Sequence, residues 1–534
     1  MSENAPWWRG ATVYQVYVRS FADSNGDGVG DFEGLISKLD YIAALGVDAL
    51  WLSPVRPSPN RDWGYDVSDY DTVNPEYGSE ADFDRLLNQA HARGLKVMTD
   101  EVLAHTSDEH AWFVESLEGG EKAAWYVWAP AREDGTAPNN WLSAFGGPAW
   151  SYHPARRASY HHKFLRQQPK LNWQDPAARE AALRVLDRWL ACGVDGFRLD
   201  VANAFLHDPN LADNPAVPEP ARNGAYWSRA ANMQLHRHDS NLPENIQVLD
   251  EIRCRVERHP DRFVMGEFSE DPERCGAFAS PTEGLHSGYS FPLLHADVLG
   301  PDFVHEHYRT LARFPAHWPS IAFSNHDVIR TVTRFGGDNP PPALARLLLA
   351  VLTALRGTLL LYQGEELGLP EASLRRDQIK DPIGDLYYPL YRGRDGCRTP
   401  MPWNDAAPDL GFTSGSPWLP LAPEHRELAV SRQERDSQST LSYARRLFAT
   451  RKASAALRLG DIEFLDAPSP VLAFLRNHGE QRYLCVFNMS GGEAALQSKW
   501  LPEAAPLSIC TGGSRIDADV LSLRPYAAFF ASLA

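Results

Sequence analysis

Apolar runs of strand length alternate with amphipathic helices through the first two-thirds of this chain, and this alternation limits its possible folds more than any other feature. The runs ATVYQVYVRSF (11–21), VDALWLSP (47–54) and LKVMTDEV (95–102) have strand character. Helical spacing of apolar residues fills the segments between them, over 32–46 and 81–94. Continuous apolar strands separated by helices predict a parallel sheet that helices cover on both faces.

The same alternation resumes after residue 175 and predicts an α/β fold, a (β/α)8 TIM barrel. A helix is expected over 176–193, and strands are expected at 194–201, 263–268, 321–327 and 358–366. A doubly wound sheet is the alternative, but no GxGxxG motif follows any of these strands.

Two segments interrupt the barrel pattern. Residues 104–175 are rich in Trp, Pro, Gly and Asn, which predicts a loop-rich inserted domain after the third strand. From about residue 457 the helical spacing stops, and short apolar runs predict a C-terminal all-β sandwich domain over 457–534. The barrel would then comprise residues 1–103 and 176–456.

Charge and cysteine usage exclude several classes of function. A formal net charge of −17 argues against binding to nucleic acid or to an anionic membrane. No apolar run approaches the roughly 20 residues of a membrane helix, and the N-terminal sequence has no secretory-signal pattern. Six cysteines are scattered without a CxxC pair. A cytoplasmic protein with reduced thiols is therefore expected. Whether it is a monomer or a homodimer stays open.

Three carboxylates stand at the ends of predicted barrel strands. Asp200 ends VDGFRLD, Glu267 ends FVMGE, and Asp327 ends IAFSNHD. Catalytic residues of TIM barrels lie at the C-terminal ends of strands. A single acid at such a position is more often a helix N-cap or part of a loop ion pair, but three of them, with His105 and His326 nearby, favour an active site.

The surroundings of two of these acids predict different protonation states. Strand alternation puts Arg198 on the same face as Asp200, and we expect this cation to keep Asp200 ionised. Glu267 follows a more apolar run and is expected to hold a proton. An ionised carboxylate beside a protonated carboxylic acid is the pair that glycoside hydrolysis requires.

The sequence DSNGDGVGD (23–31) resembles a calcium-binding loop. Asp23, Asn25, Asp27 and Asp31 alternate as oxygen donors, the ligand type that Ca²⁺ and Mg²⁺ prefer. An EF-hand loop also requires Glu at its twelfth position, where this chain has Gly34. The residues alone leave open whether this is a calcium sensor or a metal loop of another fold.

Several motifs in order make the chain resemble the α-amylase family, glycoside hydrolase family 13, and within it the α-glucosidase and oligo-1,6-glucosidase branch. The resemblance covers nearly the whole chain. The motifs are VYQVYVRSFADSNGDGVGD near the start, GYDVSDY (64–70), DEVLAHTSDEH (100–110), QPKLNW (168–173), GFRLDV (196–201), GEF (266–268), NHD (325–327), LYQGEELG (361–368) and GRDGCRTPMPW (393–403).

The resemblance implies a retaining mechanism. Asp200 would be the nucleophile that forms a glucosyl ester, and Glu267 would be the acid and then the base. Asp327 would stabilise the transition state by binding sugar hydroxyls. The carboxyl groups of Asp200 and Glu267 should lie about 5–5.5 Å apart, as retention requires.

The resemblance also implies a sugar pocket that is closed at one end. In this branch an Asp and an Arg pair across the blind end, and Asp62 and Arg394 match those positions. A closed pocket means that one glucose is removed at a time. The other residues implied for the pocket are Arg198, which would orient Asp200, His105 and His326, which would hold hydroxyls, and Tyr65 and Phe145, whose rings would flank the same sugar.

For the calcium-like loop, the resemblance implies a structural divalent cation, Ca²⁺ or Mg²⁺, and not a calcium sensor. Its ligands would be the side-chain oxygens of Asp23, Asn25, Asp27 and Asp31 and the carbonyl oxygen of Val29. No organic cofactor is implied.

Three positions depart from the family pattern. Ala104 replaces an Asn that ligates a second calcium in some relatives, so that second site is expected to be missing. Lys170 replaces the usual Asp of a QPDLN motif. Val201 follows the nucleophile, as is usual in members that favour α-1,6 bonds.

The sequence therefore predicts an exo-acting retaining α-glucosidase that hydrolyses the terminal non-reducing glucose of short oligosaccharides and α-glucosides such as maltose, isomaltose or sucrose, with transglucosylation. A sucrose isomerase or another α-glucosyltransferase would use the same residues. A non-catalytic member acting as a binding subunit is a further alternative, but such members carry a membrane segment and have commonly lost the catalytic acids. Linkage and chain-length preference stay open.

Overall fold

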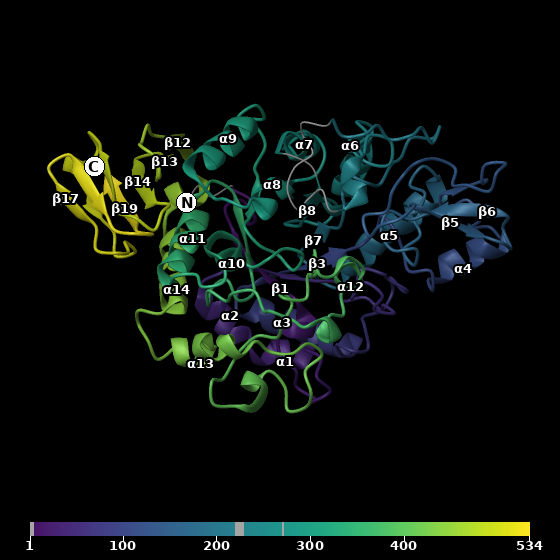
Figure 1. Ribbon diagram of the computed structural model, residues 1–534, viewed down its shortest axis with the longest axis horizontal. Helices are drawn as coiled ribbons and strands as arrows, with labels where there is room; N and C mark the ends of the chain where they lie inside the picture. The colour runs from purple at the N-terminus through teal and green to yellow at the C-terminus, as the bar shows by residue number, and fades with distance from the viewer. Residues whose placement is uncertain (1–4, 219–228, 270–271, 534) are drawn as a thin grey trace.

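The computed structural model describes residues 5–218, 229–269 and 272–533, and its centre is an eight-stranded sheet (Figure 1). The strands lie in the order β10-β11-β1-β2-β3-β7-β8-β9, and all neighbours pair in parallel. They are β1 (Thr12–Val16), β2 (Ala49–Leu52), β3 (Lys96–Glu101), β7 (Gly196–Leu199), β8 (Phe263–Phe268), β9 (Ser287–Ser290), β10 (Ser320–Ala322) and β11 (Thr358–Tyr362).

The two edges of this sheet meet, so that it closes into a barrel. The Oγ atoms of Ser287 on β9 and Ser320 on β10 lie 2.8 Å apart. Ser287 also donates a hydrogen bond to the backbone oxygen of Trp318 at 2.7 Å. The predicted TIM barrel is therefore confirmed. Sequence analysis missed β9, whose sequence SGYS contains no apolar run.

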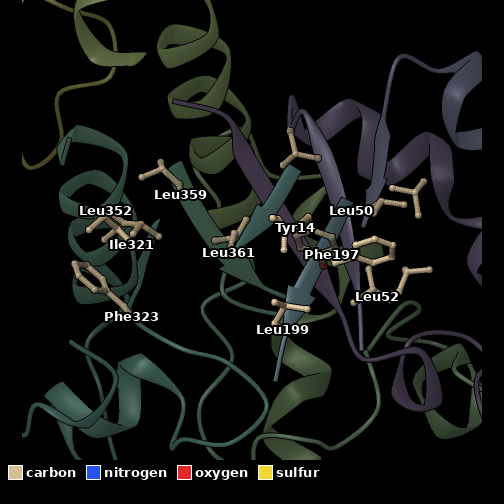
Figure 2. Packing of buried hydrophobic residues seen from close by; sticks show 14 of the residues in the cluster. Tyr14, Leu50, Leu52, Phe197, Leu199, Ile321, Phe323, Leu352, Leu359 and Leu361 are labelled. Atoms are coloured by element: carbon tan, nitrogen blue, oxygen red, sulfur yellow. The ribbon is translucent and has the colours of Figure 1, made fainter. Parts of the chain in front are cut away.

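Strand alternation separates two layers of side chains. The large cluster between the strands and the helices includes Tyr14, Leu50, Phe197 and Leu359. Figure 2 shows these residues together with Leu352 of a helix. The opposite faces of the strands fill the inside of the barrel. That inner cluster includes Val13, Trp51, Met98, Phe263, Met265 and Leu360.

The barrel helices follow their strands in sequence, and the starts of α1, α3 and α5 are capped by side chains. Asp175 accepts hydrogen bonds from the backbone N–H groups of Ala177 and Ala178, both at 2.9 Å, and Pro176 takes the first helical position. The predicted single helix over 32–46 is divided at Lys38. The helices are α1 (Phe32–Ser37), α2 (Leu39–Leu45), α3 (Glu80–Ala92), α5 (Pro176–Ala191), α6 (Asn245–Val256), α7 (Pro272–Phe278), α8 (Phe291–His295), α9 (Pro301–Leu311), α10 (Thr331–Gly336), α11 (Pro342–Ala354), α12 (Pro382–Tyr387), α13 (Val430–Gln433), α14 (Thr440–Ala453) and α15 (Ala455–Leu459).

The segment after β3 carries its own small antiparallel sheet, in the order β4-β6-β5. Its core contains Trp141, Trp150 and Val127. The elements are α4 (Ala111–Glu118), β4 (Trp128–Ala129), β5 (Trp150–His153) and β6 (Ala158–His161).

The C-terminal segment forms two antiparallel sheets, in the orders β12-β13-β14-β19-β16 and β15-β18-β17. Leu475 and Val486 of the first pack against Leu521 of the second in a common core, as a sandwich requires. In Figure 1 these strands (yellow) lie at the opposite end of the molecule from β5 and β6. The strands are β12 (Asp461–Phe464), β13 (Val471–His478), β14 (Gln481–Asn488), β15 (Ala494–Gln497), β16 (Ala505–Pro506), β17 (Arg515–Asp517), β18 (Val520–Leu523) and β19 (Ala528–Leu533).

The residue boundaries predicted for the three domains stay a prediction. Within the described ranges, no helix has the length and apolar character needed to cross a membrane.

Candidate active site

Asp200 directly follows β7 and is held by the arginine two residues before it. Arg198 is fully buried, and its Nη1 donates a hydrogen bond to Asp200 Oδ1 at 2.8 Å. The same Nη1 donates to Asp100 Oδ1, on β3, at 2.7 Å. A buried guanidinium needs such carboxylate partners. The contact that strand alternation predicted between Arg198 and Asp200 is confirmed.

Glu267, near the end of β8, shares this arginine. Its Oε1 lies 2.5 Å from Arg198 Nη2 and accepts a hydrogen bond from the Tyr289 hydroxyl at 3.1 Å. Its Oε2 accepts the backbone N–H of Val201 at 3.3 Å. One guanidinium therefore bridges the carboxyl groups of Asp200 and Glu267.

Asp327 follows β10 and lies among three basic groups. Its Oδ1 accepts hydrogen bonds from Arg394 Nη1 at 3.0 Å and from Arg398 Nη2 at 2.8 Å. Its Oδ2 lies 3.2 Å from His326 Nε2. Burial acts to raise the pKa of Asp327, but His326, Arg394 and Arg398 outweigh it and hold the pKa below its ordinary value. Asp327 is therefore ionised at neutral pH.

The predicted pair Asp62 and Arg394 forms an ion pair, with Asp62 Oδ1 2.7 Å from Arg394 Nη2. Asp381 accepts from the same guanidinium, from Nη2 at 2.8 Å and from Nε at 3.1 Å. Gln168 Nε2 donates to Asp62 Oδ2 at 3.0 Å. Groups from separate loops thus fix both partners of the pair.

The two predicted histidines both contact Tyr65, one through its ring and the other through its backbone carbonyl. The rings of Tyr65 and His326 stack with their centroids 5.2 Å apart and their planes 2° from parallel. Gln15 Nε2 donates to His326 Nδ1 at 2.8 Å, and His105 Nε2 donates to the Tyr65 carbonyl at 2.9 Å. Burial lowers the pKa of His105 to about 4 and the pKa of His326 to about 3. Both rings are therefore neutral at neutral pH.

A cavity of about 900 Å³ lies over these groups, within the usual size range of ligand pockets. Arg198 and His326 lie behind its wall. Phe145 contributes a ring to the cavity, with the Arg394 guanidinium 5.3 Å from its centroid. The predicted catalytic and sugar-pocket residues that line the cavity are Asp62, Tyr65, His105, Phe145, Asp200, Glu267, Asp327 and Arg394.

Burial makes Asp100 and Asp200, two of the acids around Arg198, hold protons more strongly. It raises the pKa of Asp200 well above its ordinary value, with Arg198 opposing the shift and Glu267 adding to it. It raises the pKa of Asp100 to about 7. The prediction that the neighbouring Arg198 cation keeps Asp200 ionised is contradicted by this shift, because one arginine is shared by three buried carboxyls. Asp100 and Asp200 contact the same guanidinium nitrogen, so these two acids titrate as a unit.

The calcium-like loop follows β1 and a 3-10 turn, without an entering helix. Its side-chain oxygens face the loop's own backbone N–H groups: Asp23 Oδ1 accepts from Asn25 at 2.9 Å, Asn25 Oδ1 from Asp27 at 2.8 Å, and Asp27 Oδ1 from Val29 at 2.8 Å. Asp31 caps the N-terminus of α1. The predicted donors therefore lie on one compact loop that their own hydrogen bonds order.

The oxygen donors of this loop are of the type that a hard cation prefers, and Asn25 and Asp27 accept one N–H each and keep further lone pairs. Asp23 already accepts three backbone N–H groups and the Thr413 hydroxyl, so a cation would have to replace some of these contacts. Over the ranges that the structure describes, no three His, Cys, Asp or Glu side chains are grouped so that they could hold a metal ion by themselves. A cation in the loop would therefore need Asn25 and a backbone carbonyl, such as that of Val29, in addition to the aspartates.

Sequence reasoning missed several buried residues that hold the site together. Asp100 lies on β3, two residues after Met98, which belongs to the inner cluster. The period of a strand could therefore have placed it inside the barrel. The others lie in loops or in a strand without an apolar run and gave no such signal. They are Gln168, Tyr289, Asp381 and Arg398.

Comparison with known proteins agrees with this geometry. Residues 15–460 match the family model described as alpha amylase, catalytic domain. A probable α-glucosidase of Rhizobium meliloti (strain 1021) is 46% identical over 538 residues, covering 99% of this chain and 97% of that protein. An oligo-1,6-glucosidase of Parageobacillus thermoglucosidasius is 34% identical over 520 residues, covering 91% of this chain and 90% of that protein.

A solved structure is similar over the same length. The α-glucosyl transfer enzyme XgtA superposes with a TM-score of 0.96 at 47% sequence identity. The match covers 99% of this chain and 100% of that one.

Proposed function

This chain belongs to the α-amylase family, and from that premise we propose that it is a retaining α-glucosidase that removes one terminal glucose at a time from short oligosaccharides and α-glucosides. The single observation that carries the proposal is the Arg198 guanidinium, which contacts both Asp200 and Glu267 beside a sugar-sized cavity. Two carboxyl groups held by one guanidinium suit the short separation that a retaining enzyme needs.

In the first step, Asp200 attacks the anomeric carbon while Glu267 donates its proton to the departing glycosidic oxygen. The bond from the anomeric carbon to that oxygen breaks, and a β-glucosyl ester of Asp200 forms. In the second step, Glu267 takes a proton from water, whose oxygen attacks the same carbon and releases Asp200. Two inversions return the α configuration. Attack requires the ionised form of Asp200, which the Arg198 guanidinium favours against the burial that raises its pKa.

The other predicted residues bind the sugar. Asp327, ionised beside Arg394 and Arg398, accepts hydrogen bonds from hydroxyls of the glucose and stabilises positive charge at the anomeric carbon. The ion pair of Asp62 with Arg394 forms the blind end and binds the hydroxyls farthest from the bond that breaks. Blocking that end excludes cleavage within a long chain.

The remaining side chains of the pocket orient the sugar. His105 and His326 are neutral and hold hydroxyls without adding charge. Tyr65 and Phe145 place apolar ring faces against the glucose ring, a contact that suits the C–H face of a sugar.

Transfer of glucose to an acceptor alcohol would follow if a sugar hydroxyl replaces water in the second step. The similarity to an enzyme described as an α-glucosyl transfer enzyme supports this activity. Isomerisation of sucrose would use the same ester, with the released fructose as the acceptor.

A substrate panel tests the proposal. Maltose, isomaltose, sucrose, trehalose and soluble starch are incubated with the protein, and early products are followed by NMR. α-Glucose released first from the short substrates, with starch almost untouched, is the expected result. β-Glucose as the first product, or internal cleavage of starch, would contradict it. Isomaltulose from sucrose would favour the isomerase alternative.

We also propose that the loop of residues 23–31 holds a structural divalent cation, Ca²⁺ or Mg²⁺. Its oxygen donors and its closely turned backbone support this, and no chemical step depends on the ion. A cytoplasmic location is a further proposal, supported by six cysteines that are all free.

A further inference from the structure

Lys170, the departure in the QPKLN motif, is a buried lysine whose ammonium forms no ion pair with a carboxylate of the residues that the structure describes. It is only 2% exposed, and its ammonium donates a hydrogen bond to the backbone oxygen of Ala204. Among the described residues, the nearby carboxylate of Asp239 pairs with Lys163 instead, at 3.0 Å. Burying an ammonium in this way is costly. An apolar side chain could fill this space without that cost, which indicates that the charge of Lys170 has a role beyond packing.

The carbonyl that Lys170 binds closes the turn directly behind the proposed nucleophile. Ala204 N–H donates to the Val201 carbonyl at 2.9 Å, which defines a turn over 201–204. Ala202 N–H donates to the Glu267 carbonyl at 2.9 Å, and Val201 N–H donates to the Glu267 carboxyl at 3.3 Å. The turn therefore connects the end of β7 to the proposed acid.

This turn is strained and needs to be held. Val201 has a φ of 43°, a left-handed conformation that is unfavourable for a β-branched residue. Such strain persists only where the surroundings fix the backbone. Lys170 is attached to a rigid support, because its N–H donates to the His161 carbonyl at 2.9 Å and Leu171 N–H donates to the Ala104 carbonyl at 3.0 Å.

The charged groups that face Lys170 come from several elements. Burial lowers the pKa of His105 to about 4 and of His207 to about 3, and it lowers the pKa of His161 well below its ordinary value. Burial acts to raise the pKa of Asp239, but Lys163 and His236 hold it well below its ordinary value. The charge states of these three histidines and of Asp239 therefore do not change near neutral pH. Burial, with Lys163 adding to it, lowers the pKa of Lys170 to about 7.

We propose that Lys170 is a positioning residue whose charged ammonium holds the 201–204 turn, so that Asp200 and Glu267 keep the geometry needed for catalysis. The proposal rests on the function proposed above. A charged donor makes the stronger hydrogen bond to a carbonyl. As pH rises and the ammonium becomes an amine, the turn is held less firmly and turnover falls.

The test compares Lys170→Met and Lys170→Gln with the wild-type protein. Neither variant side chain titrates, so the ratio of wild-type kcat to variant kcat isolates the effect of the lysine charge from that of the catalytic acids. Rates on p-nitrophenyl α-glucoside are measured from about pH 6 to about pH 8.5. Lys122→Met is the matched control, because Lys122 lies in the same inserted segment and pairs with Glu115 on the surface. Circular dichroism reports whether each variant is folded.

The expected kcat ratio is about tenfold to a hundredfold at pH 6, the range for a small misplacement of catalytic groups. It should fall to a few-fold at pH 8.5, while KM changes little and the control stays at wild-type rates. A ratio that does not vary with pH, or no loss at pH 6, would overturn the proposal. So would failure of both variants to fold, which would make Lys170 a structural anchor. A wild-type protein inactive on every α-glucoside would refute the proposed function instead.

Discussion

Substituting Glu267 by Gln separates the proposed acid role of this residue from its structural role. Gln has the same size, and its carbonyl oxygen can still accept from Arg198 and Tyr289, the two donors that contact Glu267 Oε1. The variant loses the proton and the charge, and its NH2 group also gives up the 3.3 Å contact with the Val201 N–H. General acid catalysis contributes roughly 10²- to 10⁴-fold, so kcat/KM on maltose should fall by about 10³-fold, or about 4 kcal/mol of transition-state stabilisation.

A substrate whose leaving group needs no proton should escape most of this loss. On p-nitrophenyl α-glucoside the first step should slow by about tenfold or less, about 1.4 kcal/mol. The second step still lacks its base, so p-nitrophenol should appear in a burst before a slow steady rate. Stopped-flow absorbance measures the burst, and coupled glucose detection measures maltose hydrolysis.

The matched control is Glu434→Gln, which alters an exposed carboxylate paired with Arg445 and should keep wild-type rates on both substrates. Equal losses on maltose and p-nitrophenyl α-glucoside would refute the assignment of Glu267 as the acid. The proton donor would then be sought elsewhere in the same cluster, beginning with Asp100.

Three other substitutions test separate parts of the site. Asp200→Asn should lower kcat by several orders of magnitude without changing the circular dichroism spectrum, and wild-type turnover would rule out its role as nucleophile. Asp381→Asn weakens a charge-assisted contact to Arg394 and should raise KM for maltose by about tenfold while changing kcat less; an unchanged KM would show that Asp381 does not orient that arginine. Asp27→Ala, or a chelator added to the wild-type protein, should lower the melting temperature more than it alters kcat; unchanged melting in both cases would count against a structural cation.

Much of the barrel could be predicted from the sequence, because a strand covered on both faces needs a continuous apolar run. β1, β2 and β11 carry such runs and were found. β9 has only one large apolar side chain, Tyr289, in SGYS, and its pairing with β8 is set by barrel closure and not by local preference. A closed barrel needs a strand at that place whatever its composition.

The candidate site could be predicted only in part. Strand ends pointed to Asp200, Glu267 and Asp327, because an acid after an apolar run is unusual. Asp381 and Gln168 lie in loops, where no period indicates which way a side chain points. Their roles depend on contacts between segments far apart in the sequence.

Protonation states were the least predictable property of the site. Sequence spacing places Arg198 next to Asp200 but does not show that Asp100 and Glu267 share the same cation. It also does not show how far water is excluded. The neighbouring acids and the exclusion of water both raise the pKa of Asp200. Together they outweigh Arg198, the one neighbour that the sequence revealed, which lowers it.

The arrangement of charge in the cavity wall connects the two demands of the proposed reaction. Three carboxyl groups, those of Asp100, Asp200 and Glu267, share the single positive charge of Arg198, so the acids outnumber their cation. The excess favours retention of a proton, which the departing oxygen requires. After that proton leaves, the same excess of negative charge faces an anomeric carbon that is becoming positive, in a site with little water to screen it. A second arginine among these acids would remove both effects, since it would lower their affinity for the proton and oppose positive charge on the sugar.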